Sequence, residues 1–272
     1  MKFKELFDGT KIPVLGQGTW RMVETYTNPD IDKPVVEALR EGIKLGMTHI
    51  DTAEHYGEGH AEEVIAEAIK PFDREKLFIT TKVWRTNLRY DDVIKAMEGS
   101  LKRLKLKYID LYLVHWPNPD IPLKETMEAM GYLAEEGKTR FIGVSNFSLK
   151  KLKEAQSYLK KHKIVTNQVR YSLLYREPEK ELLPYCEKNN IVLTAYSPLE
   201  SGRLAKPGIK VLDDIANKYK KTQVQVALNW LISKKNVITI PKATKAEHVR
   251  EIIEAIDWKL SKADIERLNR II

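Results

Sequence analysis

The sequence predicts an α/β protein with a (β/α)8 TIM-barrel fold, an N-terminal β-hairpin and extra helices near the C-terminus. Apolar runs of about four to eight residues alternate with amphipathic stretches of roughly ten to fifteen, a pattern typical of repeated βα units and a parallel sheet. Eight such runs occur, and eight parallel strands close a barrel. At 272 residues the chain has a length at which α/β barrels form one unit, so residues 1–272 are expected to be a single barrel domain.

The hairpin is expected over residues 3–13, where Asp8-Gly9 forms a turn between two short mixed runs. The barrel strands are expected near residues 14–16, 47–51, 77–82, 109–115, 139–144, 164–168, 191–196 and 237–240. We find no linker, low-complexity tract or short-period repeat between these runs, which favours one domain.

Helices are expected between the strands, because apolar residues recur there at i, i+3, i+4 and i+7 spacing. In residues 91–104, Asp91 and Asp92 favour the first turn and basic residues favour the last. In residues 148–160, Ser148 is the expected N-cap. Both stretches therefore carry a helix start signal as well as an apolar face.

Glycine and proline mark further helix ends, with glycine expected just after a helix and proline at its beginning. The positions concerned are Gly46 and Gly137 for the ends and Pro122 and Pro178 for the beginnings. Residues 223–233 and a segment after Ser261 are expected to be helices additional to the eight-fold alternation. Ser261 and Asp264 resemble a capping box.

The composition excludes several classes of protein. Cys186 is the only cysteine, so an intramolecular disulfide and four-thiolate zinc or iron-sulfur sites are excluded, and no metal site is expected. Cys186 lies in an apolar helical pattern and is expected to be a core residue. The net charge of +8 could suggest nucleic acid, but lysines and glutamates are interleaved along nearly every helix, which is typical of a solvated face. We therefore expect no nucleic-acid partner.

No apolar run approaches the roughly 18 to 20 residues of a membrane span, and the N-terminus carries charges where a signal peptide has an apolar block. A cytoplasmic protein that does not bind a membrane is therefore expected. The high lysine and glutamate content also suggests the hypothesis of a thermophilic source.

Every expected strand ends at a polar or aromatic residue. These ends are, in strand order, Gly18-Thr19-Trp20, Asp51, Lys82-Val-Trp84, His115-Trp116, Ser145-Asn146, Gln168, Tyr196-Ser197-Pro198 and Pro241-Lys242. The active sites of eight-fold barrels lie at the carboxyl ends of the strands. We therefore expect these residues to surround one site.

Four of them form a chemical constellation. A lysine at the rim of a closed core needs a partner, and Asp51 on the neighbouring strand can supply it to Lys82. His115 ends the next strand, and Tyr56 lies on the loop after Asp51. Taken alone, Asp51 could equally be a helix cap or a turn former, and His115 could be a satisfied core histidine.

Together these groups can work as an acid. A phenol has a pKa of about 10, and an adjacent ammonium favours phenolate and lowers that pKa. Asp51 would keep the Lys82 ammonium charged and fixed. Tyr56 would then be a general acid for a carbonyl oxygen, which His115 would orient or polarise.

The missing reagent is expected to be a cofactor, because no convincing covalent nucleophile, Gly-x-Ser-x-Gly motif or metal-ligand pattern is present. Tyr196 can stack on a flat ring, and Lys242 can supply a cation for a phosphate. The residues able to hydrogen-bond a carboxamide are Ser145, Asn146 and Gln168. Gly16-Gln-Gly18 is not a Rossmann fingerprint, since no helix opens directly after it.

At this point the chain closely resembles the aldo-keto reductase family, from about Asp8 to its end. The matching segments are together highly specific: Gly16-Gln-Gly-Thr-Trp20, Asp51-Thr-Ala-Glu-His-Tyr-Gly57, Thr81-Lys-Val-Trp84, Leu113-Val-His-Trp-Pro117, Gly143-Val-Ser-Asn-Phe147, Asn167-Gln168, Ala195-Tyr-Ser-Pro-Leu199 and Ile240-Pro-Lys242.

The resemblance implies reduction of an aldehyde or ketone by hydride transfer from a nicotinamide cofactor bound extended across the barrel mouth. It implies a catalytic tetrad of Asp51, Tyr56, Lys82 and His115, with Tyr56 as the proton donor. The implied cofactor-binding residues are Thr19, Trp20, Asp51, Ser145, Asn146, Gln168, Tyr196, Ser197, Pro198, Leu199, Ser201, Ile240, Pro241, Lys242, Ala243, Thr244, His248 and Glu251. The expected substrate pocket comprises Trp20, Tyr56, Trp84, His115 and Trp116.

NADPH is the expected cofactor, with NADH use also allowed. In the family's NADP-binding segment a Lys-Ser pair is commonly followed by an Arg and an Asn, whereas this chain has Lys242-Ala243, His248 and Ile252. Lys242 still favours the 2′-phosphate, but the usual hydroxyl and guanidinium are missing. The chain also lacks the long C-terminal loop that narrows the pocket in many animal members, so an open pocket and a broad substrate range are expected.

The expected partner is a small carbonyl or alcohol substrate, and the protein is expected to be a monomer or a weak oligomer. Two alternatives remain open. The chain could be a regulatory or binding module that keeps the barrel and cofactor site without useful turnover. It could also be a barrel lyase or isomerase that uses Asp51 and Glu54 as acid and base, because fold alone does not determine chemistry.

Overall fold

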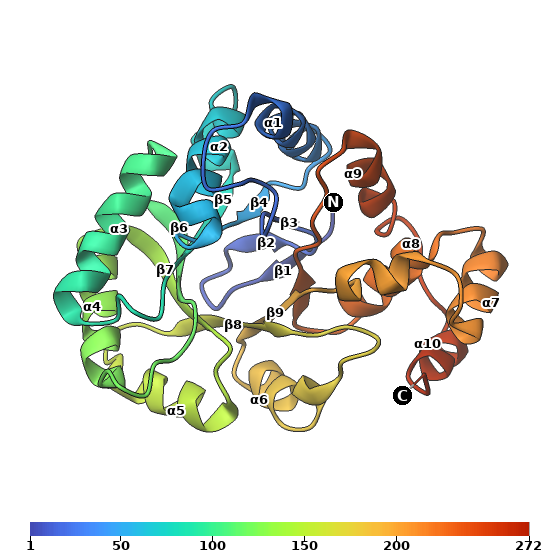
Figure 1. Cartoon of the computed structure of the whole chain (residues 1–272). Helices are drawn as coiled ribbons and strands as arrows, with labels where there is room; N and C mark the ends of the chain where they lie inside the picture. Colours follow the sequence, from blue (N-terminus) through green and yellow to red (C-terminus); the bar gives the residue numbers. More distant parts are fainter. Residues whose placement is uncertain (272) are drawn as a thin grey trace.

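A parallel barrel forms the centre of the computed structural model, which describes residues 1–271. Eight strands follow one another around the sheet in chain order, and helices surround them (Figure 1). The strands are β3 Gln17–Gly18, β4 His49–Asp51, β5 Phe78–Val83, β6 Ile109–Val114, β7 Thr139–Ser145, β8 Ile164–Arg170, β9 Val192–Tyr196 and β10 Val237–Thr239. Each neighbouring pair is parallel, so the predicted fold class is confirmed.

The barrel closes where the first strand segment meets the last. Leu15 forms an isolated parallel bridge with Thr239. The backbone N–H of Gly16 donates to the oxygen of Thr239 at 2.8 Å, and that of Gly18 donates to the oxygen of Pro241 at 3.0 Å. These bonds pair backbone groups of the two edge strands, which an open eight-stranded sheet would leave unpaired.

The first strand was predicted over residues 14–16, which is wrong. The regular strand is Gln17–Gly18, and the preceding residues contribute only the bridge. Gly18 approaches the last strand so closely that a Cβ there would lie 2.5 Å from the backbone oxygen of Ile240. Because two glycines flank Gln17, this strand lacks the apolar pattern by which the other seven were found.

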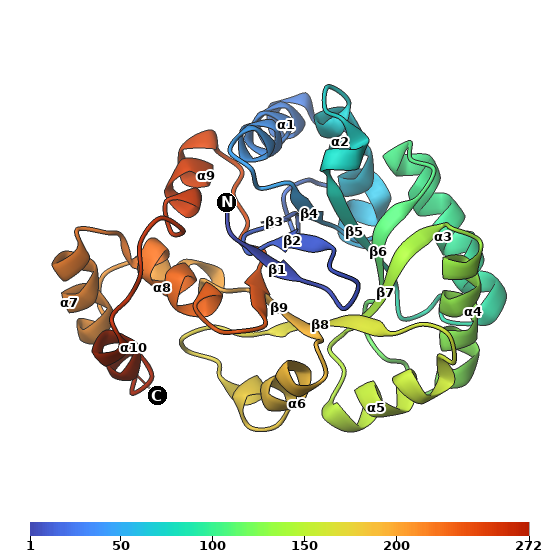
Figure 2. The ribbon, with the colours of Figure 1, turned by 180° about the vertical axis from the view of Figure 1, so that it is seen from behind.

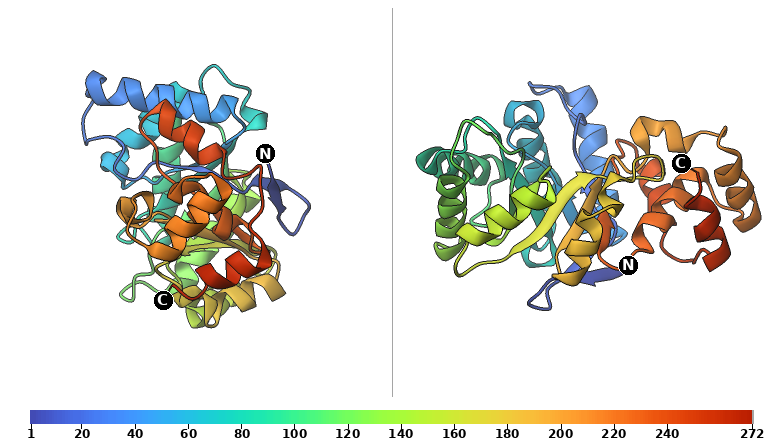
Figure 3. Two further views of the ribbon diagram at one scale, coloured as in Figure 1. Left: turned by 90° about the vertical axis from the view of Figure 1, so that its right-hand side faces the viewer. Right: turned by 90° about the horizontal axis from the view of Figure 1, so that it is seen from below.

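The predicted N-terminal hairpin is confirmed as β1 Phe3–Glu5 paired with β2 Lys11–Pro13. Gly9 turns the chain with a φ of +85°. Leu6 and Ile12 pack with inward-facing barrel residues such as Phe78, and Figures 2 and 3 show the hairpin lying across one end of the barrel. The hairpin covers the amino ends of the strands, which leaves the carboxyl ends accessible.

Ten α-helices are formed by residues 1–271, and most lie around the outside of the barrel. They are α1 Pro29–Lys44, α2 His60–Ile69, α3 Tyr90–Leu104, α4 Leu123–Glu135, α5 Leu149–Tyr158, α6 Leu182–Lys188, α7 Lys210–Tyr219, α8 Gln223–Ile232, α9 Ala246–Ile253 and α10 Lys262–Leu268. Ser148 caps α5 as predicted, accepting from the Lys151 N–H at 3.3 Å. Gly46 and Gly137 follow α1 and α4 with positive φ, as predicted. Cys186 is buried, as expected of a core residue.

Two predicted helix starts need correction. Pro122 is the N-cap residue of α4, so that helix begins one residue later. Pro178 lies in the 3-10 turn η3 Glu177–Glu179, and α6 begins only at Leu182. A proline sets its own φ for either kind of turn, so it cannot distinguish a 3-10 turn from an α-helix.

The predicted capping box at α10 is only half present. Ser261 Oγ accepts from the Asp264 N–H at 3.1 Å, but the Ser261 N–H donates to Tyr219 Oη at 2.9 Å. The Asp264 carboxylate instead accepts from Lys218 at 2.6 Å and from Tyr219 at 2.8 Å. Asp264 therefore joins α10 to α7.

The helix predicted at 223–233 is present as α8, but it is not the additional one. Residues 224–232 are all buried, and α8 packs against β10 as an outer helix of the barrel. The additional pair consists of α7 and α10, which lie side by side outside the ring of helices (Figures 1 and 3). Of the additional pair, α7 buries only Leu212, Ile215 and Ala216, at the i, i+3, i+4 spacing of an ordinary outer helix. Its sequence pattern therefore does not mark it as additional, whereas the all-round apolar pattern of α8 was mistaken for that sign.

None of the helices formed by residues 1–271 has the length and apolar character needed to cross a membrane.

Candidate active site

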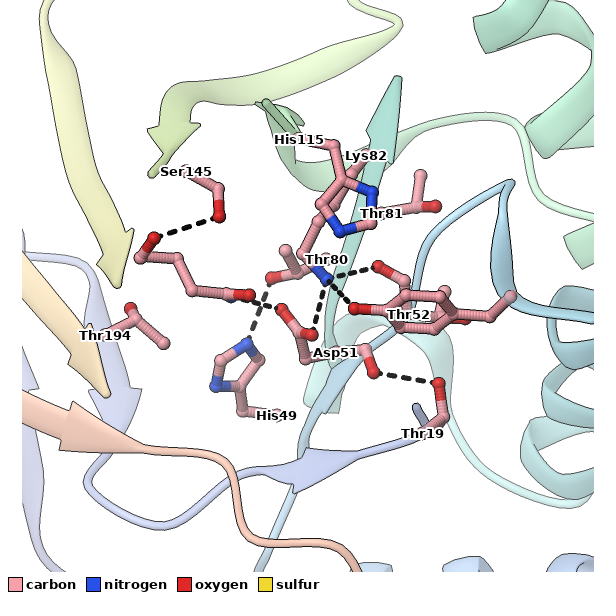
Figure 4. A network of polar contacts seen from close by, with 12 residues as sticks. Thr19, His49, Asp51, Thr52, Thr80, Thr81, Lys82, His115, Ser145 and Thr194 are labelled. Atoms are coloured by element: carbon pink, nitrogen blue, oxygen red, sulfur yellow. Dashed lines mark hydrogen bonds and ion pairs between the residues drawn. The ribbon is translucent and has the colours of Figure 1, made fainter. Parts of the chain in front are cut away.

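The four residues of the predicted tetrad meet at the carboxyl ends of the strands. Figure 4 shows Asp51, Lys82 and His115 there. Asp51 ends β4, Lys82 lies in β5 and His115 directly follows β6. Tyr56 begins the short 3-10 segment η1 Tyr56–Gly59. Lys82 Nζ lies 2.6 Å from Asp51 Oδ1 and 3.3 Å from Tyr56 Oη, and the rings of Tyr56 and His115 have centroids 5.5 Å apart.

The lysine is fully buried and all its donors are used. Besides Asp51 and Tyr56, its ammonium donates to the backbone oxygen of Thr52 at 2.7 Å. Burial alone would lower the pKa of Lys82, but Asp51 and Tyr56 together outweigh it and raise that pKa above its usual value. The Lys82 side chain is therefore a fixed cation beneath the phenol.

The aspartate is held on both of its oxygens. Its Oδ2 accepts from Gln168 Nε2 at 2.6 Å, across the barrel from β8. Thr19 Oγ1 donates to the backbone oxygen of Asp51 at 3.0 Å, as Figure 4 shows. With one oxygen on Lys82 and the other on Gln168, the carboxylate of Asp51 can orient its neighbours but is not free to move a substrate proton.

The sequence predicted a lowered pKa for Tyr56, and this prediction is wrong for the net shift. Lys82 does favour the phenolate, but burial of the phenol outweighs it and the pKa of Tyr56 is raised. Tyr56 is only 7% exposed, and its ring packs on Trp20 at a centroid distance of 4.9 Å. The phenol therefore keeps its proton at neutral pH and can donate it.

His115 is neutral. Burial, then the charge of Lys82 and the nearby His55, lower its pKa to about 2. Its Nδ1 has no hydrogen-bonding partner within residues 1–271, so it is not a satisfied core histidine. Asn146 Nδ2 donates to the backbone oxygen of His115 at 3.1 Å, and Trp84 packs edge-on against its ring at 5.1 Å. These contacts hold the imidazole beside the phenol.

A cavity of about 920 Å³ opens over this cluster. Of the residues predicted for the cofactor or the substrate, those lining it are Thr19, Trp20, Asp51, Tyr56, Trp84, His115, Trp116, Ser145, Asn146, Gln168, Tyr196, Ser197, Pro198, Leu199, Ser201, Ile240, Pro241, Lys242, His248 and Glu251. Ala243 and Thr244 do not line it. Ala243 instead packs against the apolar cluster formed by α1, α8 and α9.

Five lining residues were named neither at a strand end nor among the expected cofactor and substrate residues: Arg21, His55, Gly202, Ala205 and Val224. Gly18, which was expected at the site as part of a strand end, and Ile252, which was noted as a departure from the family pattern, also line the cavity. Arg21 and His55 directly neighbour Trp20 and Tyr56, so their place in the chain could have revealed them. Val224 belongs to α8, far along the chain from any motif. Only the folding of that helix against the barrel mouth brings it to the cavity.

A hydrogen-bonded shelf occupies one side of the cavity. Ser145 Oγ donates to the backbone oxygen of Gln168 at 2.9 Å, and Asn146 Nδ2 donates to Ser145 Oγ at 3.0 Å. Tyr196 Oη donates to Asn146 Oδ1 at 2.9 Å. Asn146 has a φ of +63°, a left-handed conformation that a non-glycine residue keeps only where its surroundings hold it, often at functional sites.

The three predicted tryptophans all line the cavity. Trp20 and Trp116 remain 48% and 41% exposed, large values for this side chain. Trp20 packs on the ring of Tyr56, and Trp84 packs on the ring of His115. They form an apolar wall around the phenol and the imidazole, where a small organic molecule could be enclosed.

Glu54 does not line the cavity. Its Oε1 accepts from the Trp84 N–H at 2.6 Å and from Asn87 Nδ2 at 3.0 Å, so the carboxylate joins two loops behind the site. With Glu54 turned away and Asp51 bound to Lys82 and Gln168, a lyase or isomerase mechanism based on these two carboxylates has no geometric support.

Comparison with known proteins shows the family of the chain. Residues 14–272 match the model of the aldo/keto reductase family. The chain is 40% identical to methylglyoxal reductase YeaE of Escherichia coli over 95% of this chain and 90% of that protein, and 37% identical to glyoxal reductase of Bacillus subtilis over 98% and 91%.

Solved structures of aldo-keto reductases are also similar to this chain. A thermostable aldo-keto reductase in complex with the inhibitor epalrestat superposes with a TM-score of 0.95 at 47% identity, covering 100% of both chains. An aldo/keto reductase from Klebsiella pneumoniae in complex with NADP and acetate gives a TM-score of 0.89 at 38% identity, covering 99% of this chain and 95% of that one.

Proposed function

The chain belongs to the aldo/keto reductase family, and we propose on that premise that it is an NADPH-dependent enzyme that reduces aldehydes or ketones to alcohols. The observation that carries the proposal is the Lys82 ammonium, buried between Asp51 at 2.6 Å and the Tyr56 hydroxyl at 3.3 Å. A protonated phenol on a fixed cation, beside a neutral imidazole, is suited to give a proton to a carbonyl oxygen.

When bound, NADPH supplies the hydride. The carbonyl oxygen of the substrate lies between Tyr56 Oη and the ring of His115, and Tyr56 donates its proton as negative charge develops on that oxygen. The Lys82 ammonium stabilises the phenolate left behind, and Asp51 keeps the ammonium in place. His115, being neutral, can donate an N–H to the same oxygen. The indoles of Trp20, Trp84 and Trp116 line the cavity and give it an apolar wall.

The residues around the cavity fit a nicotinamide dinucleotide. The shelf formed by Ser145, Asn146 and Gln168 presents amide and hydroxyl groups suited to a carboxamide, next to the ring of Tyr196. Ser197 and Ser201 have φ values of +51° and +53°, which supports a role for this segment in holding a ligand. Solved relatives from Klebsiella pneumoniae in complex with NADP and with NADPH support the same cofactor here.

Lys242 is proposed to bind the 2′-phosphate that distinguishes NADPH from NADH. It is an exposed cation that lines the cavity. Lys242→Ala should raise KM for NADPH roughly ten- to a hundredfold, the value of one charged hydrogen bond, while KM for NADH changes little. Lys245→Ala, which removes an exposed lysine outside the cavity, is the control. Equal effects of Lys242→Ala on both cofactors would exclude the phosphate role.

The pKa shifts predict how the rate depends on pH. The raised pKa of Tyr56 keeps the acid protonated, and the pKa of His115 near 2 keeps the imidazole neutral throughout the working range. For reduction, kcat/KM should therefore be level between about pH 5 and pH 8. Alcohol oxidation needs the phenolate, so its kcat/KM should rise about tenfold per pH unit over the same range. A reduction profile that falls as a group of pKa near 6.5 ionises would show that His115 titrates instead.

The function as a whole is tested by following NADPH oxidation with a panel of aldehydes, ketones and sugars, and repeating the series with NADH. Turnover with several small carbonyl compounds is expected, in keeping with an open pocket. A protein that binds NADPH but oxidises none of it with any substrate would be a binding module instead. The monomer or weak oligomer expected from the sequence stays a prediction.

A further inference from the structure

His55 lies at the cavity and takes no part in the mechanism above. It directly precedes Tyr56, lines the cavity and is exposed. Neither of its ring nitrogens has a hydrogen-bonding partner in the chain from Met1 to Ile271. By contrast, His49 is bonded to Thr80, and His60 is bonded to Asp32 and Glu63. His55 therefore offers donor and acceptor atoms that the fold does not use.

The ring of His55 is fixed. It stacks on Trp84 with a centroid distance of 3.7 Å and an interplanar angle of 6°. Trp84 is in turn held by the bond from its backbone N–H to Glu54 and packs edge-on against His115. Because the face of the imidazole is covered by the indole, its nitrogens lie on the ring edge and stay available. His55, Trp84 and His115 thus form one continuous wall beside the reacting carbonyl.

The residues around His55 determine which substrate groups its ring can bind. Its ring stacks on the indole of Trp84, and the same cavity is lined by the indoles of Trp20 and Trp116, which offer little to a charged or hydroxylated substrate. A cation also lines the cavity beside Trp20, namely Arg21, whose guanidinium lies 5.4 Å from the Trp20 ring. The Asp51 carboxylate is neutralised by Lys82. The second carboxylate that lines the cavity, Glu251, belongs to α9. An electron-rich group on the substrate would therefore meet a hydrogen-bond donor at His55.

We propose that His55 is a specificity-determining residue that donates a hydrogen bond to a second oxygen of the substrate. The preferred substrates are aldehydes or ketones carrying a carboxylate or hydroxyl a few atoms from the reacting carbon. This inference rests on the proposed carbonyl reduction and adds to it the class of substrate. Loss of a hydrogen bond to a charged group of the substrate should lower kcat/KM roughly ten- to a hundredfold. Loss of one to a neutral group should lower it about two- to tenfold.

The test compares matched substrate pairs. The specificity ratio is kcat/KM for 4-oxobutanoate divided by that for butanal, and likewise for 2-hydroxypropanal divided by propanal. The division removes effects on the chemical step that both members of a pair share. His55→Phe keeps an aromatic ring against Trp84 and removes both nitrogens, so at least one specificity ratio should fall. The 4-oxobutanoate ratio should fall about tenfold or more if His55 binds a carboxylate. The 2-hydroxypropanal ratio should fall about two- to tenfold if His55 binds a hydroxyl.

Two further variants make the result specific. His55→Gln restores an amide donor and should recover part of the lost ratio. His162→Phe changes a histidine before β8, outside the cavity, and should leave both ratios at the wild-type value. The pair whose ratio falls identifies the group bound: the first pair indicates a carboxylate and the second a hydroxyl.

The outcomes separate this inference from the function on which it rests. If wild-type protein reduces both members of each pair and His55→Phe leaves both ratios within twofold, the role of His55 is wrong and the carbonyl reductase stands. If the wild type oxidises NADPH with none of the four compounds, the proposed function fails and the inference fails with it.

Discussion

Tyr56→Phe is expected to lower kcat for carbonyl reduction by about 10²- to 10⁴-fold, because it removes the proposed general acid and little else. The ring still packs against Trp20, and Lys82 keeps its bonds to Asp51 and to the Thr52 carbonyl. NADPH affinity should therefore stay near the wild-type value. Steady-state kinetics, with NADPH titrated separately by fluorescence, would measure the two effects.

Tyr112 provides a matched control for Tyr56→Phe. Tyr112 in β6 is fully buried, and its hydroxyl has no partner within residues 1–271. Tyr112→Phe removes the same atom from a phenol outside the cavity and should leave kcat unchanged. Near-normal activity of Tyr56→Phe would show that the proton comes from another group.

Lys82→Met is expected to have the largest effect on stability as well as on turnover. It leaves the Asp51 carboxylate buried without its cation, and an unpaired buried charge costs about 3–5 kcal/mol. Turnover should be lost too, because nothing would then stabilise the phenolate of Tyr56. Urea unfolding of the variant and its kcat give both quantities.

The double variant Asp51→Asn with Lys82→Met separates the two effects. It removes both charges, so it should recover part of the lost stability while remaining inactive. Lys102→Met, at an exposed position of α3, serves as the control and should change neither quantity. A Lys82→Met protein as stable as wild type would mean that Asp51 is protonated or hydrated when alone.

The pairing of Asp51 with Lys82 could be predicted from sequence because it needs only two neighbouring strands. A lysine inside an apolar run demands a partner, and adjacent parallel strands place their ends together. The bond from Gln168 to Asp51 could not be predicted in this way. The two residues are 117 positions apart, and they meet only because the barrel is closed.

The pKa of Tyr56 is a second property that could be predicted only in part from the sequence. The charge of Lys82 was evident from its place in the chain, and it does act in the predicted direction. The opposing effect comes from burial, which depends on how Trp20 and the neighbouring loops pack over the phenol. Residue identities alone do not give the balance between these two effects.

The predictions for the first barrel strand and for the additional helices were wrong for the same reason. Both depend on which segments pack against the barrel rather than on local pattern. Gly18 approaches the Ile240 backbone, and α8 packs against β10 while α7 does not. Local periodicity predicted that helices would be present but did not distinguish their tertiary positions.

Transfer of label from cofactor to product is the most direct test of the whole account. Wild-type protein would be incubated with NADPH deuterated at the reactive C4 position and an aldehyde that it consumes, and the product analysed by mass spectrometry and NMR. We predict one deuterium on the carbinol carbon for each NADPH oxidised, with the hydroxyl proton drawn from solvent through Tyr56. An alcohol without deuterium, or substrate conversion without NADPH oxidation, would contradict reduction by hydride transfer.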